Sequence, residues 1–304
     1  MLLALFACSP PPPAPEGLDA ASSYLVREFY SDDATFQAGV QGFMQWFEDE
    51  GHELVGEAAT TDNTEAFTVG DLTNEDVAHL PLDEELLVDP DTDTWEKRDV
   101  GNAAGVVSLA EMDCTWQESE EWLLRADQDT IFTDDWEGYE RTYVTSKDAY
   151  TGASSSGDYD SIEEALSPFE DGFDTGPYER TLLFTENLVD PSPVLFADMP
   201  AYEMNLDFRH GAYEIGDEQL SAFAILTWHP AAVWGDGGEN GLLQTYSVEI
   251  NVERTSGKTL RMLAVWAQPV GAGLEPDDAF VLNYAVNKSL SSSERMSEVC
   301  AEGL

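Results

Sequence analysis

The sequence predicts an α+β fold in which an antiparallel twisted sheet packs on a long C-terminal helix, with an N-terminal helical pair. From Tyr246 to Glu253, apolar and polar residues alternate with the period of a strand that has one buried face. After turn residues 255–258, residues 260–267 return as a strand that is apolar on both sides. We therefore expect it inside the sheet, with both faces covered. Residues 277–299 carry an apolar stripe after an acidic, proline-containing start, which predicts the closing helix.

The other elements are predicted from local patterns. The N-terminal helices are expected around residues 18–30 and after Asp32 or Asp33, either of which can cap the second helix. Thr115 and Glu118 form a capping box that starts a helix running to about residue 125. Between these helices the signals are weak, and we expect irregular chain with short strands or one short helix near 73–80. Strands are expected at 103–112, 136–145, 179–188, 202–208 and 222–229, with a long loop after 146 that holds one helical turn at 162–166.

The charge of the chain restricts its partners. The 304 residues include 61 acidic and 13 basic side chains, which gives a net charge of −48. Binding to nucleic acid requires clustered Lys and Arg, so no nucleic-acid partner is expected. The acidic residues are spread along the chain, which favours a solvated acidic surface; a site for cations or for a basic partner is the alternative.

We expect the N-terminus to carry a targeting signal; a soluble chain with an incidental apolar start is the alternative. The segment Leu5-Phe6-Ala7-Cys8 resembles the lipobox of bacterial lipoproteins, and a Ser and four prolines follow it. The resemblance implies lipidation of Cys8 and a membrane anchor through that lipid alone, because no later stretch is apolar for long enough to span a bilayer. The chain lacks a basic leader and its apolar start is short, so we expect the true start to lie upstream of Met1.

Three parts of the chain follow from these features. Residues 1–17 are a signal remnant, lipobox and Pro-rich linker, residues 18–100 are a helical region packed on the main domain, and residues 101–304 are the α+β sheet domain. With Cys8 lipidated, Cys114 and Cys300 remain as a pair, and a disulfide between them would contribute about 4 to 5 kcal/mol. Two unconnected thiols are the alternative.

Motifs for chemistry are incomplete. Residues 256–259, Ser-Gly-Lys-Thr, resemble the end of a phosphate-binding loop, but they join two strands and lack the first glycine. The loop that follows Asp89 resembles a calcium loop, but it lacks the Gly and Glu of that motif. His229 at a strand end and His210 in an expected turn could bind a metal only if the strands bring them together. We therefore predict no catalytic residues, no metal and no cofactor.

The aromatic residues of the sheet are the candidate ligand site. We expect Trp228, Trp234, Tyr246 and Trp266 to share one face of the sheet. They either form part of the core or line a cavity for an apolar or sugar-like ligand.

Two resemblances bear on fold and function. The element order of residues 103–300 is similar to that of the START-like, or helix-grip, superfamily; the segments that suggest it are 106–124, 247–270 and 277–290. That resemblance implies a curved sheet around the C-terminal helix, an apolar cavity between them and a binding role, without implying any chemistry. The whole chain also resembles uncharacterised lipoproteins of myxobacteria and related Deltaproteobacteria, on its lipobox, acidity and Trp-rich strands.

The expected function is that of a lipid-anchored protein of the bacterial cell envelope, facing the periplasm or the outer surface. We expect it to bind an apolar small molecule or an envelope protein partner without catalysis. A structural or assembly component of the envelope is the first alternative, and a hydrolase with an unrecognised carboxylate or metal site is the second.

Overall fold

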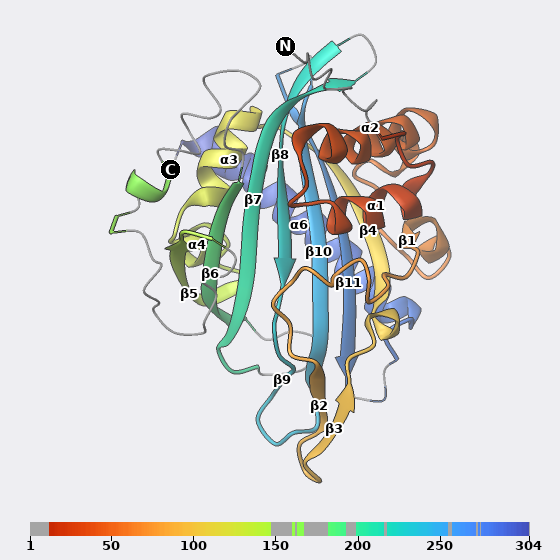
Figure 1. Ribbon diagram of the computed structural model, residues 1–304, viewed down its shortest axis with the longest axis vertical. Helices are drawn as coiled ribbons and strands as arrows, with labels where there is room; N and C mark the ends of the chain where they lie inside the picture. The colour runs from red at the N-terminus through yellow and green to blue at the C-terminus, as the bar shows by residue number, and fades with distance from the viewer. Residues whose placement is uncertain are drawn as a thin grey trace, which may run out of the picture.

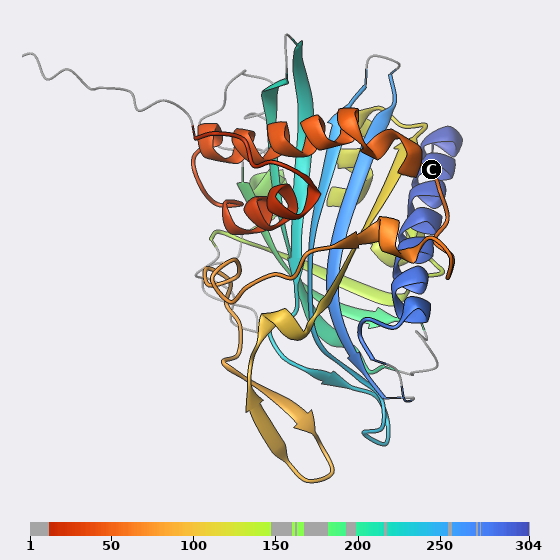
Figure 2. The same cartoon turned by 90° about the vertical axis from the view of Figure 1, so that its right-hand side faces the viewer.

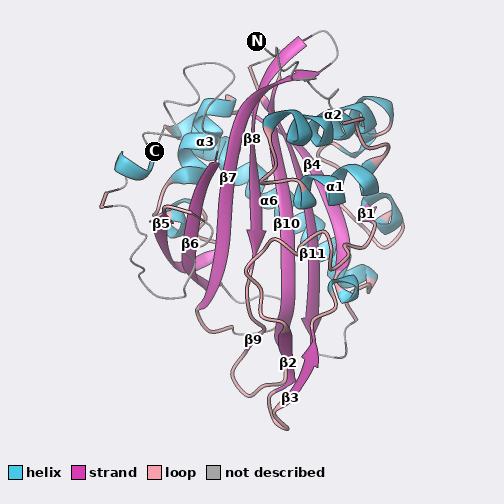
Figure 3. Cartoon of the chain, in the orientation of Figure 1, coloured by secondary structure: helices cyan, strands magenta, loops and turns pink. Residues whose placement is uncertain are grey.

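The computed structural model shows an antiparallel sheet between two layers of helices (Figures 1 and 2). It describes residues 12–303 with gaps at 147–159, 162, 167–181, 193–198, 216–217, 255–256, 272 and 274. The long sheet packed on a long C-terminal helix, with helices at the N-terminus, confirms the predicted fold class. Figure 3 marks helices and strands along the same view.

The main sheet has the order β1-β4-β11-β10-β8-β7-β6-β5, and β9 pairs with one end of β10. Every neighbouring pair is antiparallel, and a separate hairpin is formed by β2 and β3. The strands are β1 Thr68–Val69, β2 Glu85–Asp89, β3 Thr94–Lys97, β4 Ala104–Met112, β5 Trp136–Val144, β6 Leu182–Pro191, β7 Tyr202–Ile215, β8 Glu218–Trp228, β9 Val233–Trp234, β10 Gly241–Glu253 and β11 Thr259–Val270.

The helices cover both faces of this sheet. In Figure 1, α1 and α2 lie in front of the sheet and α6 lies behind it. The α-helices are α1 Leu18–Arg27, α2 Asp33–Asp49, α3 Trp116–Leu124, α4 Gln128–Ile131 and α6 Ala279–Glu302, and short 3-10 turns span Gly51–Leu54, Thr64–Phe67 and Val100–Asn102. The strand β11 lies between β10 and β4, as its apolar character on both sides predicted.

Capping residues set the starts of two helices. The carboxylate of Asp32 accepts a hydrogen bond from the Thr35 N–H at 3.2 Å at the start of α2. The capping box predicted from Thr115 and Glu118 is present at the start of α3. The segment 73–80, in contrast, forms turns rather than a helix, and Asp76 accepts hydrogen bonds from Thr73 within it.

The N-terminal helices are attached to the sheet by buried polar contacts as well as by apolar packing. The Tyr30 hydroxyl donates to the Asp207 carboxylate on β7 at 2.6 Å. The Arg209 guanidinium, also on β7, donates to the carbonyls of Phe29 and Ser31 and pairs with Asp33 at 2.7 Å. One hydrophobic core contains residues from both sides of residue 100, so the N-terminal region and the sheet domain are packed as a unit.

A disulfide joins Cys114, just after β4, to Cys300 in the last turn of α6. The two Cα atoms are 5.6 Å apart although 186 residues separate them in the sequence. Met112, Phe132 and Met296 pack around the bridge. The C-terminal end of α6 is therefore covalently held against the sheet.

Candidate functional site

The two faces of β11 differ in how completely they are buried. Met262, Ala264 and Trp266 face the N-terminal helices and are fully buried. Leu263 and Val265, which face α6, are only partly buried. Since successive side chains of a strand point to opposite faces, the layer between β11 and α6 contains unfilled space where the other layer is solid.

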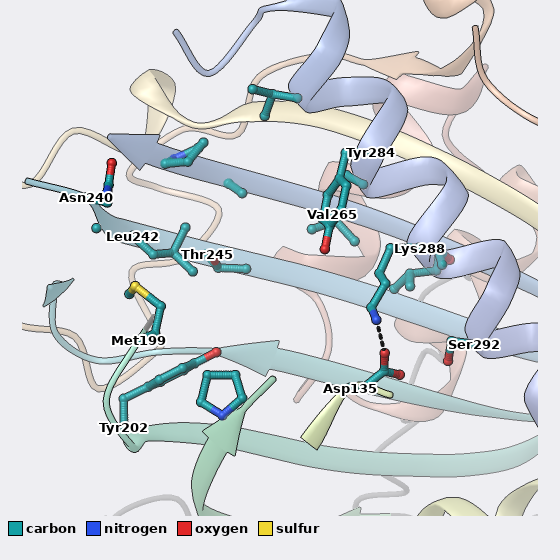
Figure 4. Close-up of a pocket in the computed structure, with 18 of the residues that line it drawn as sticks. Asp135, Met199, Tyr202, Asn240, Leu242, Thr245, Val265, Tyr284, Lys288 and Ser292 are labelled. Atoms are coloured by element: carbon teal, nitrogen blue, oxygen red, sulfur yellow. Dashed lines mark ion pairs between the residues drawn. The ribbon is translucent and has the colours of Figure 1, made fainter. Parts of the chain in front are cut away.

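That space is a cavity of about 390 Å³ between the sheet and α6 (Figure 4). Its walls are predominantly apolar. The sheet contributes Leu242, Thr245, Leu263, Val265, Ala267 and Pro269; α6 contributes Val281, Tyr284, Ala285, Lys288 and Ser292; and the side next to β5, β6 and β7 contributes Asp135, Trp136, Pro191, Met199 and Tyr202. A volume of this size is within the range of small-molecule sites, which are concave and lined mainly by apolar side chains.

An ion pair connects two walls of the cavity. The Lys288 ammonium on α6 lies 2.6 Å from a carboxylate oxygen of Asp135, just before β5 (Figure 4). The same ammonium donates to the Asp134 carbonyl at 3.1 Å. Both charged groups are thereby engaged with each other rather than with the interior of the cavity.

A second, buried ion pair includes Arg261, which also lines the cavity. The Arg261 guanidinium donates to the Glu249 carboxylate at 2.6 Å and to the Ser293 hydroxyl at 2.8 Å. The Asn251 amide also donates to Glu249, at 2.8 Å. Buried charges are tolerated only when they are paired and hydrogen-bonded, and these contacts supply that pairing.

A buried polar atom of the wall, the Thr245 hydroxyl oxygen, has no hydrogen-bond partner among the described residues. Thr245 lines the cavity beside a register shift between β10 and β11. Its hydroxyl oxygen is buried and, within the described part of the chain, makes no hydrogen bond. Leaving such a group unpaired costs about 1 to 3 kcal/mol, so a ligand that hydrogen-bonds to Thr245 would recover part of that cost. Across the cavity, burial raises the pKa of Tyr202 to about 12, so its hydroxyl stays neutral.

Three of the four predicted aromatic residues lie on the opposite face of the sheet. Trp228, Tyr246 and Trp266 form a row across β8, β10 and β11, as expected for residues that share one face. All three are fully buried in the core beneath the N-terminal helices, and none lines the cavity. The fourth, Trp234 in β9, donates its indole N–H to the Leu87 carbonyl at 2.8 Å and does not line the cavity either.

The polar atoms of the Tyr246 and Trp266 side chains are hydrogen-bonded within the core. The Tyr246 hydroxyl accepts from Arg98 and donates to Gln244, each at 3.0 Å. The Trp266 indole donates to the Gly70 carbonyl at 2.9 Å, and a Cβ on Gly105 would come within 2.5 Å of the indole nitrogen. The residues that indicate the cavity are therefore Leu263 and Val265. They alternate with the core residues along β11 and lie on its other face.

The histidines form no metal site. His210 lies within β7, not in a turn as expected, and its ring nitrogen is 3.2 Å from the Glu120 carboxylate of α3. His229 is also buried, next to the Tyr202 ring. Among the residues that the structure describes, no group of three His, Cys, Asp or Glu side chains could hold a metal ion. Asp89 accepts from the N–H groups of Asp91 and Thr92, which fits a hairpin turn.

Comparisons with known proteins add a fold-level likeness only. No protein-family model matches the chain, and no curated protein matches it. Among solved structures, the crystal structure of Ara h 8.0201 is similar to 66% of this chain over 99% of its own length, with 8% identity and a TM-score of 0.30. Over the described residues, no helix is long and apolar enough to cross a membrane. The function therefore has to be inferred from the residues of the cavity.

Proposed function

We propose that the chain binds a small apolar molecule in the cavity between the sheet and α6, and that it does so without catalysis. The observation that carries the proposal is the unfilled, apolar-lined space of about 390 Å³ behind β10 and β11. A core that served only stability would be close-packed, as the opposite face of the same strands is. The element order of residues 103–300 resembles that of helix-grip proteins, and that resemblance implies an apolar cavity between sheet and helix.

The proposal is tested with N-phenyl-1-naphthylamine, an uncharged probe that fluoresces in apolar surroundings. The full chain should give a saturable increase with a stoichiometry of one. Ala267→Phe places a larger side chain in the cavity from a position that already lines it, and should reduce the affinity at least tenfold. The matched control is Trp95→Ser on the β2–β3 hairpin, which removes a 52% exposed apolar side chain and should leave the titration unchanged.

Three results would reject the binding role in this cavity. Either no saturable signal appears, or the Ala267→Phe protein binds the probe as well as the original chain. If Trp95→Ser alone abolishes the signal, the probe has bound to the exposed hairpin, and the cavity is not a ligand site.

We further propose that the chain is attached to the bacterial cell envelope by a lipid on Cys8, with the domain facing the periplasm or the outer surface. Cys8 lies outside the described residues, so the support comes from the lipobox-like segment and the prolines after it. The Cys114–Cys300 disulfide also supports it, because such bridges persist in oxidising compartments. Expression with an upstream leader should yield an acylated N-terminal peptide, and Cys8→Ser should release the protein into the soluble fraction. An unacylated, uncleaved chain would rule out the anchor.

A further inference from the structure

We propose that the ligand of this cavity is uncharged and carries a hydrogen-bonding group that pairs with Thr245, and that the cavity discriminates against a carboxylate of the same chain length. This inference rests on the proposed ligand-binding function and specifies the class of ligand. It follows from how the charged and polar residues of the cavity wall are already partnered.

The first observation is that the described residues of the cavity wall offer no unpaired charge. Among them, three charged side chains line the cavity: Asp135, Lys288 and Arg261. Lys288 is paired with Asp135, and Arg261 is paired with Glu249, each at 2.6 Å. A negatively charged ligand would therefore need to compete with an existing carboxylate for either cation.

The second observation is the cost of that competition. If a ligand carboxylate took the place of Asp135 beside Lys288, the Asp135 carboxylate would be left in a partly buried position without its cation. The exchange forms one ion pair and breaks another, while it brings an additional negative charge to a chain whose net charge is −48. An uncharged head group avoids both penalties.

The third observation is the polar atom that remains available. Thr245 Oγ1 lines the same cavity, is buried and makes no hydrogen bond within the described residues. A hydroxyl can donate or accept, so it can pair with the hydroxyl or carbonyl of an uncharged ligand. The wall thus provides a buried, uncharged polar contact at Thr245 in predominantly apolar surroundings; the hydroxyls of Tyr202, Tyr284 and Ser292 belong to the same wall.

Competition against N-phenyl-1-naphthylamine tests the inference, with 1-decanol and decanoate as probes of equal chain length at pH 7.5. Decanol should displace the dye at least ten times more effectively than decanoate. Asp135→Asn removes the competing carboxylate and frees Lys288, so it should strengthen decanoate binding relative to decanol binding by about tenfold or more. Thr245→Val, which keeps the shape of the side chain, should weaken decanol binding by roughly three- to tenfold.

Asp134→Asn is the matched control. It removes the same charge one residue away, but Asp134 contacts Lys288 only through its carbonyl, which the substitution retains. The preference for decanol should persist in this variant. If Asp134→Asn strengthens decanoate binding as much as Asp135→Asn, net charge rather than the ion pair sets the preference, and the assigned mechanism is wrong.

The remaining outcomes separate this inference from the function on which it rests. Equal or tighter binding of decanoate by the unmodified chain overturns the inference and leaves the ligand-binding function intact. Unchanged decanol affinity in Thr245→Val overturns the role assigned to that hydroxyl. Failure of the unmodified chain to bind the dye, decanol and decanoate overturns both proposals. Thermal unfolding of each variant shows whether a loss of binding reflects a loss of folding.

Discussion

Val265 and Trp266 are consecutive residues of β11 that serve different layers of the molecule. The Trp266 side chain is fully buried beneath the N-terminal helices, and its indole donates to the Gly70 carbonyl. The Val265 side chain is partly exposed and lines the cavity next to α6. Stability and ligand binding therefore depend on opposite faces of one strand, and substitutions should separate them.

Trp266→Ala should destabilise the protein without removing the cavity. Deleting a large, fully buried aromatic side chain costs about 3 to 5 kcal/mol, and here the Gly70 carbonyl also loses its donor. Urea unfolding should show the loss, while dye binding under conditions where the variant is folded should change less than threefold. A stable Trp266→Ala protein that no longer binds the dye would place the ligand on the face of the sheet beneath the N-terminal helices, and would contradict a site next to α6.

The disulfide should contribute substantially to stability. Replacing both Cys114 and Cys300 with Ser opens a loop of 186 residues, which costs about 5 kcal/mol in the chain-entropy model. Denaturant unfolding of the double variant should reveal this loss, and reduction of the unmodified chain should reproduce it. Equal stability of the oxidised and reduced proteins would contradict a structural role for the bridge.

The buried ion pair of Arg261 and Glu249 should behave as a coupled unit. Glu249→Gln leaves the Arg261 guanidinium buried without its counter-charge, and breaking such a pair costs about 3 to 5 kcal/mol. Replacing both residues together, as Glu249→Leu with Arg261→Met, should recover much of the loss because no buried charge remains. A double-mutant cycle measures the coupling; additive losses would show that the two charges do not stabilise one another.

His229 should make stability fall in mild acid. Burial, with a smaller contribution from Arg98, lowers the pKa of His229 from 6.5 to about 4. The imidazole of His229 therefore binds a proton more readily in the unfolded chain than in the folded one. Its contribution to the free energy of unfolding is fully present above pH 6.5 and is lost as the pH falls toward 4. By pH 5 the loss should be about 2 kcal/mol.

Denaturant unfolding between pH 7.5 and pH 5 measures this effect. His229→Phe should weaken the dependence without abolishing it, because burial also lowers the pKa of His210, to about 3; His52→Gln, at an exposed histidine, is the control. An unchanged pH dependence in His229→Phe would show that another group is responsible.

The sequence predicted the layers of the fold better than it predicted the site. Period-two alternation located β10 and β11 because burial on a sheet face imposes that period, and capping chemistry located the start of α3. The length of β7 was underestimated because Arg209, His210 and Gly211 interrupt the apolar pattern. Those residues are buried in the strand, where Arg209 is held by partners from the N-terminal segment.

The site could not be located from the sequence because both faces of β11 are apolar. Large aromatic side chains such as Trp266 could form part of the core or line a cavity, and the structure places them in the core, where their volume fills the solid layer. Smaller residues such as Val265 and Ala267 leave the space beneath α6 open. Which face is filled depends on the N-terminal helices, and their position relative to the sheet is set by distant contacts such as that of Tyr30 with Asp207.

The most direct test of the cavity is methyl NMR of the full chain during titration with 1-decanol. The methyl groups of Leu263, Val265 and Val281, which line the cavity, should shift and saturate together. The methyl groups of Val248 and Ile250, which are buried in the opposite layer, should remain in place. Saturable shifts confined to Val248 and Ile250, or no saturable shift at any methyl group, would contradict a ligand site between the sheet and α6.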